Sequence, residues 1–191
     1  MHQSDTTAHT ARLEAVIDAQ AALDGRCLSA TSADLDRLDE VIPGLLISAD
    51  LGITDEERAE RLRAWVAAGV THYLDLRAEA DDTVFIAQHA PGIEVRRAPT
   101  HDDRTQKTTW FDEVLVAVGD LLDRSDVTLL VTCAAGVARA PSAVFRILLS
   151  RGWGEQEAIA AIAAARPAAE ITYAPDAFVH AVLDELWGTA A

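Results

Sequence analysis

The chain has 191 residues, half of them hydrophobic and a quarter charged, which is typical of a soluble domain with a sizeable core. Acidic residues outnumber basic ones by 31 to 16, so the formal net charge is −15, and binding to nucleic acid or to an anionic membrane is disfavoured. No apolar segment approaches the roughly 20 residues that span a bilayer, and the N-terminus lacks the apolar core of a signal peptide. We therefore expect a cytoplasmic protein. Its two cysteines, Cys27 and Cys133, are too few for a disulfide framework.

Taken in order, the hydrophobic pattern alternates between strands and helices. Residues 1–37 are expected to form an N-terminal extension with an amphipathic helix over 11–24, and residues 38–191 the main domain. The segment 41–48 indicates two short strands about a Pro-Gly turn, and Thr54 with Glu57 predicts the capping box of the next helix. The remaining elements are expected at 71–77 (strand), 81–90 (helix), 93–98 (strand), 108–122 (helix), 127–132 (strand), from 139 (helix), around 158–162 (helix) and from 175 (helix).

This alternation predicts an α/β fold with one central sheet, mixed but mostly parallel, and helices on both faces. The stretch 127–132 is almost continuously apolar, as expected of a strand that is covered on both sides. A further short helical turn is expected within 35–40. The N-terminal helix is an addition to this architecture.

The segment from Cys133 to Arg139 has the composition of an anion-binding loop. It follows the buried strand and leads into a helix that begins at the arginine, and its intervening residues are uncharged: Ala134, Ala135, Gly136, Val137 and Ala138. Backbone N–H groups of such a loop and the helix N-terminus attract an oxyanion, and a guanidinium group matches phosphate with two parallel hydrogen bonds. The same positive field favours the thiolate of Cys133, which is the nucleophilic form. The segment therefore predicts phosphate binding and nucleophilic attack.

With these motifs the chain resembles the cysteine-dependent protein tyrosine phosphatase superfamily, and within it the dual specificity branch, over roughly residues 39–186. The resemblance implies that 38–191 is a catalytic domain and that Cys133 forms a phosphocysteine while Arg139 and the loop N–H groups hold the phosphate oxygens. By motif position Asp102 is the general acid and base, with Asp103 as the alternative. No cofactor and no metal is implied, and the six histidines lack the spacing of a joint metal site. The supporting motifs are Val-Ile-Pro-Gly-Leu-Leu-Ile-Ser at 41–48, Ala-Gly-Val-Thr-His-Tyr-Leu-Asp-Leu-Arg at 68–77, Ala-Pro-Thr-His-Asp-Asp at 98–103, the Cys133 loop and Ala-Ala-Arg-Pro at 164–167.

Two residues depart from the family pattern. Family members usually carry histidine before the cysteine and serine or threonine after the arginine, where this chain has Thr132 and Ala140. The missing hydroxyl is thought to stabilise the cysteine sulfur while phosphocysteine is hydrolysed. Ser142 lies about 200° further round the helix, too far to replace it. We therefore expect slow turnover with accumulation of phosphocysteine.

The expected function is hydrolysis of phosphotyrosine, with phosphoserine and phosphothreonine as further candidates, in a phosphorylated protein or a small phosphomonoester. The alternative is a catalytically weak or inactive protein that recognises phosphate on the same fold, as Thr132 and Ala140 suggest. A sulfur-transfer enzyme of the rhodanese type is disfavoured by the spacing to Arg139 and by Asp102. A lipid or RNA substrate is disfavoured by the uncharged loop and the acidic surface.

Overall fold

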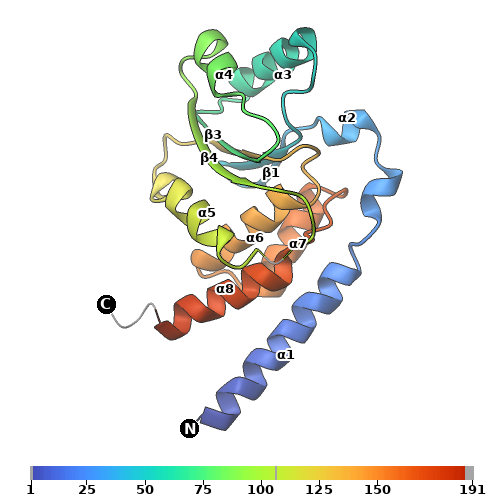
Figure 1. Cartoon of the computed structure of the whole chain (residues 1–191), viewed down its shortest axis with the longest axis vertical. Helices are drawn as coiled ribbons and strands as arrows, with labels where there is room; N and C mark the ends of the chain where they lie inside the picture. Colours follow the sequence, from blue (N-terminus) through green and yellow to red (C-terminus); the bar gives the residue numbers. More distant parts are fainter. Residues whose placement is uncertain (1, 106, 188–191) are drawn as a thin grey trace.

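The strands assemble into one five-stranded sheet in the order β1-β2-β5-β3-β4 (Figure 1). A computed structural model describes residues 2–105 and 107–187. β1 (Asp39–Ile42) is antiparallel to β2 (Leu45–Ser48), whereas β2, β5 (Leu129–Thr132), β3 (His72–Arg77) and β4 (Glu94–Thr100) run parallel. The sheet is therefore mixed but mostly parallel, as predicted.

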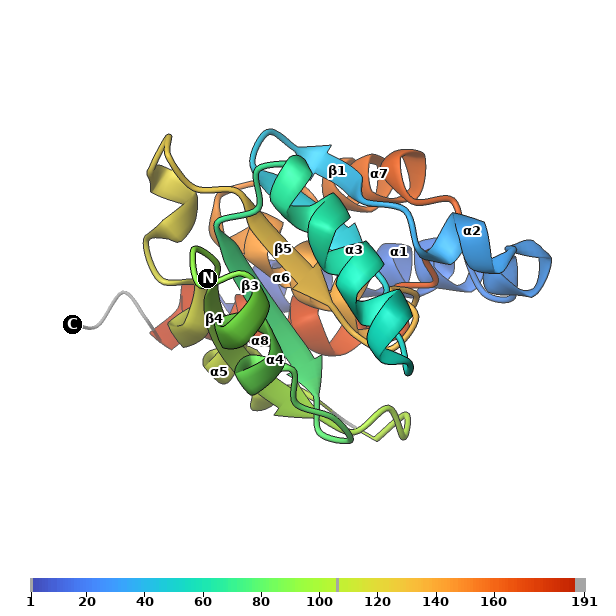
Figure 2. The same cartoon turned by 90° about the horizontal axis from the view of Figure 1, so that it is seen from above.

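Helices cover both faces of this sheet, which confirms the predicted fold class. On one face lie α3 (Asp55–Ala67) and α4 (Thr83–His89); on the other lie α5 (Trp110–Val118), α6 (Arg139–Ser150), α7 (Glu155–Ala165) and α8 (Ala174–Trp187) (Figure 1 and Figure 2). Along β5 the buried side chains alternate, because Leu130 packs beneath α3 and α4 while Leu129 and Val131 pack into the larger cluster opposite. A strand that is buried on both faces explains the continuous apolar run.

The N-terminal segment differs in detail from the prediction. The first helix, α1, spans His2–Ala21 rather than 11–24, and it packs against α7 and α8. There Val16 is fully buried, and Arg12 forms an ion pair with Glu155. A 3₁₀ turn (Arg26–Ser29) and α2 (Ser32–Leu35) then lead into β1, so the helical turn expected within 35–40 lies earlier in the chain.

The helix expected over 108–122 is also shorter than predicted. α5 ends at Val118 because Gly119 adopts φ 50° and ψ −127°, a conformation that side-chain-bearing residues rarely adopt, and a 3₁₀ turn (Leu121–Asp123) follows. The capping box of Thr54 and Glu57 is present as predicted. Among the described residues, no helix is both long and apolar enough to cross a membrane.

The parallel strands end at a common edge of the sheet. Their register pairs Thr132 of β5 with Ser48 of β2 on one side and with Asp75 of β3 on the other. The loops that follow these strands therefore begin side by side, which is where open parallel sheets usually bind ligands. The Cys133 loop is the central one of this group.

Candidate active site

The Cys133 loop connects the end of β5 to the first residue of α6, Arg139, as the sequence predicted. Gly136 has φ +65°, and a Cβ atom there would come within 2.6 Å of the Ser48 carbonyl oxygen, so the tight turn requires glycine. Cys133 is buried at the base of the loop, whereas Ala134 is exposed at its mouth. The thiol therefore lies at the buried end of the loop.

The carbonyl groups of this loop are held from outside. Arg166 donates from Nε to the Gly136 oxygen (2.6 Å) and from Nη2 to the Ala135 oxygen (2.8 Å). The Glu170 N–H donates to the Val137 oxygen at 2.9 Å, and the Asp50 N–H to the Ala134 oxygen at 3.3 Å. Within residues 2–105 and 107–187, the N–H groups of residues 134–138 have no protein acceptor. Unpaired N–H groups on a helix N-terminus are suited to bind an oxyanion.

The loop's neighbour after β2 is held by a buried arginine. Arg77 binds the carboxylates of Asp50 (2.6 Å), Asp75 (2.9 Å) and Asp82 (2.5 Å). Since the N–H of Asp50 contacts the Cys133 loop, this network fixes one wall of the site.

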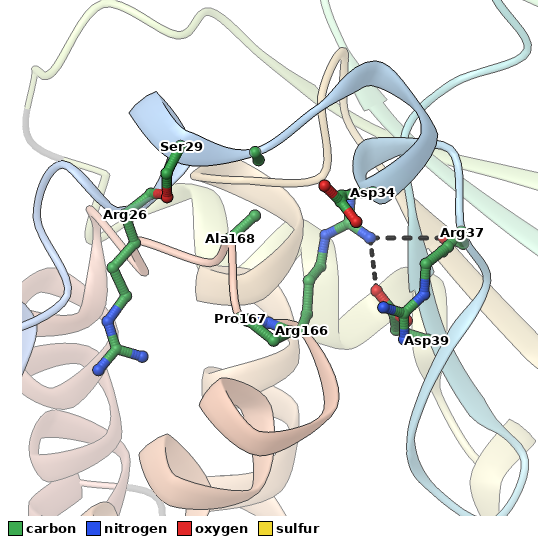
Figure 3. Close-up of a pocket in the computed structure, with 9 residues that line it drawn as sticks. Arg26, Ser29, Asp34, Arg37, Asp39, Arg166, Pro167 and Ala168 are labelled. Atoms are coloured by element: carbon green, nitrogen blue, oxygen red, sulfur yellow. Dashed lines mark hydrogen bonds and ion pairs between the residues drawn. The ribbon is translucent and has the colours of Figure 1, made fainter.

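A pocket of about 200 Å³ lies on the outer side of Arg166, between the N-terminal segment and the loop after α7 (Figure 3). Its charges are largely paired: Arg166 binds Asp39 at 2.8 Å, Arg37 binds the other oxygen of Asp39 at 2.8 Å, and Asp34 caps α2 through Thr31. The pocket is therefore part of the support of the loop.

Arg139 is almost completely buried beside the loop and is oriented by two acceptors. Its Nη1 and Nη2 atoms bind the two carboxylate oxygens of Glu79 at 2.8 and 2.6 Å, and Nη1 also donates to the Thr100 carbonyl oxygen at 2.9 Å. Burial is the largest single influence and would lower the pKa of Arg139, but the hydrogen bonds to Glu79 and the nearby charges of Cys133, Glu79 and Asp102 together raise the pKa above its ordinary value, so the guanidinium stays charged. Its Nε is buried without a hydrogen-bond partner among the described residues. An unpartnered buried donor on a cation is an anion-binding feature.

Asp102 is a second acidic residue beside Arg139. Its Oδ2 atom is 3.6 Å from Arg139 Nε, and its Oδ1 atom accepts a hydrogen bond from the Tyr173 hydroxyl at 2.7 Å. Asp103 turns elsewhere, because its carboxylate binds Lys107 Nζ and the Thr105 hydroxyl, both at 2.7 Å. Those hydrogen bonds, chiefly the one from Lys107, hold the pKa of Asp103 well below its usual range.

The two positions that depart from the family pattern are buried and carry no contact to the loop interior. The Thr132 hydroxyl donates to Tyr73 Oη at 3.1 Å, on the far side of β5. Ala140 is fully buried in the core. The Ser142 hydroxyl donates to the Ala138 oxygen at 2.7 Å and accepts from the Tyr173 N–H at 3.0 Å, so it is committed elsewhere.

One cluster outside this site has the donor atoms of a metal centre. Asp112, His180 and Asp184 bring a ligand atom each within 4.8 Å of one another. However, Arg146 donates to His180 Nδ1 at 2.8 Å and also pairs with Asp184, and His180 Nε2 lies 2.9 Å from Asp112 Oδ1. A guanidinium in the centre of the cluster would repel a cation, so these residues form a polar network between α5, α6 and α8.

Three residues that orient the site were given no role by the sequence analysis: Glu79, Arg166 and Tyr173. Arg166 lies in the quoted Ala-Ala-Arg-Pro motif, so its position was noted without its function. Glu79 follows β3 at the same edge as Cys133, a placement that the predicted strand order could have suggested. Nothing in the sequence distinguishes Tyr173, because its contact with Asp102 spans 71 positions.

The three-dimensional structure matches known phosphatase structures. A mouse protein assigned as a dual specificity phosphatase, crystallised with zinc tungstate, has a TM-score of 0.64 at 21% identity, over 84% of this chain and 93% of its own. Human DUSP28 has a TM-score of 0.59 at 21% identity, over 81% and 95% of the two chains. A human tyrosine phosphatase-like serine/threonine/tyrosine-interacting protein has a TM-score of 0.56 at 17% identity, over 81% and 98%.

The chain therefore has the fold of the cysteine-dependent dual specificity phosphatases, as the sequence resemblance implied. No protein-family model and no curated protein sequence matches it. At this level of identity the structural likeness defines the fold, and the chemistry has to be argued from the site itself.

Proposed function

We propose that the protein is a cysteine-dependent phosphatase that hydrolyses phosphate monoesters: phosphotyrosine, with phosphoserine and phosphothreonine as further candidates. The observation that carries the proposal is the buried Arg139, whose Nε has no hydrogen-bond partner among the described residues, beside a loop that begins at Cys133 and whose N–H groups are unpaired in the same part of the chain. Such a site binds a tetrahedral oxyanion directly above a thiol. The likeness in fold to dual specificity phosphatases agrees with this chemistry.

In the first step the Cys133 thiolate attacks phosphorus, the bond from phosphorus to the leaving oxygen breaks, and Asp102 donates a proton to that oxygen. Arg139 and the loop N–H groups hold the remaining phosphate oxygens and stabilise the charge of the transition state. In the second step a water molecule attacks the phosphocysteine, Asp102 accepts its proton, and the sulfur–phosphorus bond breaks. Inorganic phosphate leaves and the thiolate is restored.

Asp102 is proposed for proton transfer in preference to Asp103. Asp102 faces Arg139, whereas the Asp103 carboxylate is bound by Lys107 and the Thr105 hydroxyl. The Asp103 side chain is thus already held by partners in its own loop, while Asp102 keeps one oxygen toward Arg139.

The net charge of the chain bears on its substrate, and its two free thiols bear on its compartment. A net charge of −15 opposes polyanions, so a protein or small molecule with a single phosphate group is favoured over nucleic acid. Cys27 and Cys133 are both free thiols, and Cys133 has to be reduced to react, so we assign the protein to the reducing cytoplasm.

The competing function is recognition of phosphate with little turnover. It is favoured by Ala140, which leaves the sulfur without a hydroxyl partner, and by the likeness in fold to the human tyrosine phosphatase-like interacting protein. Under the main proposal, the same Ala140 makes hydrolysis of phosphocysteine the slow step.

An aryl phosphate assay separates the two functions. The wild type should hydrolyse the substrate, Cys133→Ser should abolish activity, and Asp102→Asn should lower kcat/KM by roughly 100-fold or more, as expected of a general acid. Asp103→Asn is the matched control and should stay within about tenfold of the wild type, because its side chain only orders the loop. Wild-type activity no higher than that of Cys133→Ser would refute the phosphatase and favour the binding protein.

A further inference from the structure

Tyr173 is a buried aromatic residue between α7 and α8 whose hydroxyl reaches the candidate general acid. It donates to Asp102 Oδ1 at 2.7 Å and accepts from the Arg104 N–H at 3.3 Å. Because the phenol has one proton and Arg104 supplies its own, the Tyr173 proton is available to Asp102 alone. Burial and the hydrogen bond to Asp102 both raise the pKa of Tyr173, so the phenol remains a donor at neutral pH.

The Tyr173 side chain is itself fixed on several sides. Its backbone N–H donates to the Ser142 hydroxyl, which in turn donates to the oxygen of Ala138, the residue before Arg139. Its ring packs edge-on against Trp110, with 6.5 Å between the centroids, and Lys107 Nζ lies 5.7 Å from the ring centre. Tyr173 therefore connects the end of the Cys133 loop, through Ser142, with the Asp102 carboxylate.

Asp102 depends on this hydrogen bond because, among the described residues, no group of its own loop donates to its carboxylate. Its side chain is 43% exposed, and the following residues include Arg104 in the left-handed region at φ 57°. With Oδ1 held by Tyr173, the other oxygen, Oδ2, is turned toward Arg139 Nε at 3.6 Å. Oδ2 therefore faces the guanidinium that is proposed to hold the phosphate oxygens.

We propose that Tyr173 is a positioning residue that holds Asp102 in the orientation required for proton transfer. This inference rests on the proposed phosphatase function and adds to it a role for the loop between α7 and α8. Tyr173 acts through Asp102 and does not touch phosphate. Its loss should therefore affect a substrate only to the extent that the leaving oxygen needs a proton.

The test compares two leaving groups in Tyr173→Phe. For phenyl phosphate, whose leaving oxygen is strongly basic, we expect kcat/KM to fall by roughly 10- to 100-fold, the size of effect that a small misplacement of a catalytic group produces. For dinitrophenyl phosphate, whose leaving group departs without protonation, the decrease should stay below about threefold. In an Asp102→Asn background the same substitution should have no further effect, because the group that it positions is gone.

The second tyrosine of the chain provides a matched control. Tyr73 is also buried, but its hydroxyl contacts Thr132 and Arg77, not Asp102. Tyr73→Phe should alter both substrates by the same factor, leaving their ratio unchanged. Competitive inhibition by inorganic phosphate should be the same in wild type and Tyr173→Phe, since the phosphate contacts are retained.

Equal losses for both leaving groups in Tyr173→Phe, or a loss that adds to that of Asp102→Asn, would overturn the positioning role and leave Tyr173 as a packing residue. The failure of the underlying proposal looks different: the wild type itself would show no Cys133-dependent hydrolysis of either substrate. In that case both inferences are refuted together.

Discussion

Ala140 follows Arg139 at the start of α6, and its methyl group is fully buried. In the family that the sequence resembles, a hydroxyl at this position is thought to stabilise the sulfur as it leaves phosphorus. Ser142 does not replace this hydroxyl, because its own hydroxyl donates to the Ala138 oxygen. The residues proposed for attack on the substrate are thus all present. The hydrolysis of phosphocysteine, however, lacks the hydroxyl that would stabilise the leaving sulfur.

We expect Ala140→Ser to accelerate turnover of an aryl phosphate. Restoring one hydrogen-bond donor to a leaving group should raise kcat by roughly 10- to 1,000-fold, judged from the loss caused by deleting single donors elsewhere. Rapid-quench experiments should show a burst of released phenol in the wild type that becomes smaller in the variant.

Ala143→Ser is the control for this substitution, since Ala143 is equally buried in the same hydrophobic cluster and on the same helix but does not follow Arg139. It should lower stability and leave the burst unchanged. A wild type without a burst, together with an unchanged kcat in Ala140→Ser, would contradict the assignment of the slow step.

From the sequence, Asp102 is the expected general acid by motif position, and Asp103 remains an alternative that the sequence does not exclude. In the structure Lys107 binds Asp103, whereas Asp102 lies beside Arg139. Such a choice depends on the fold of the loop, not on the residue types in it.

Arg166 ties several elements together at the Cys133 loop. Besides the Ala135 and Gly136 oxygens it binds the Leu35 oxygen and Asp39, so it links the end of α7 with the start of β1. A planar guanidinium can serve these acceptors at once from three nitrogen atoms, whereas a lysine ammonium has three donors on one atom. The geometry of the anion-binding loop therefore depends on an arginine that lies outside it.

We expect Arg166→Lys to destabilise the fold by about 2–4 kcal/mol, because buried charge-assisted hydrogen bonds are lost and acceptors remain unsatisfied. The inhibition constant of inorganic phosphate should rise by roughly tenfold or more as the loop loses its fixed shape. Chemical denaturation and competitive inhibition measure the two effects.

The matched control is Arg151→Lys, whose arginine is paired with Asp123 at the surface at 2.7 Å. It should change stability by less than about 1 kcal/mol and leave phosphate inhibition as it is. If Arg166→Lys binds phosphate as the wild type does, the loop is shaped by its own sequence and Arg166 only stabilises the fold.

The elements themselves were largely predictable. The apolar run of β5, the small residues of the loop and the helix after Arg139 are encoded locally, and the structure reproduces them in order. The shorter α5 depends on how Gly119 is used, and a glycine near a helix end is compatible with either outcome. Glu79 and Tyr173 reach the site only because separate loops converge at one sheet edge, so they required the tertiary structure.

For the whole molecule, the sequence predicted a layered α/β fold but left the attachment of the N-terminal helix open. α1 is mostly polar, and among its described side chains (residues 6–21) only Val16 is fully buried, which gives a weak periodic signal. The structure places Val16 and Leu23 in the same core cluster as β5 and α6. We therefore treat residues 1–37 as an extension that shares its core with residues 38–191, and this can be tested by unfolding.

We expect Val16→Ala to lower the free energy of unfolding of the entire chain by about 1–2.5 kcal/mol, since it removes two buried methyl groups and leaves a cavity. Chemical denaturation followed by tryptophan fluorescence is suitable, because the buried Trp65 and Trp110 lie outside α1 and report on the sheet region. Ile17→Ala is the control: Ile17 is the next residue of the same helix and 43% exposed, so its truncation should change stability by less than about 0.5 kcal/mol. An extension that unfolds independently would instead leave the fluorescence transition of Val16→Ala at the wild-type denaturant concentration, because the core around Trp65 and Trp110 would not depend on α1.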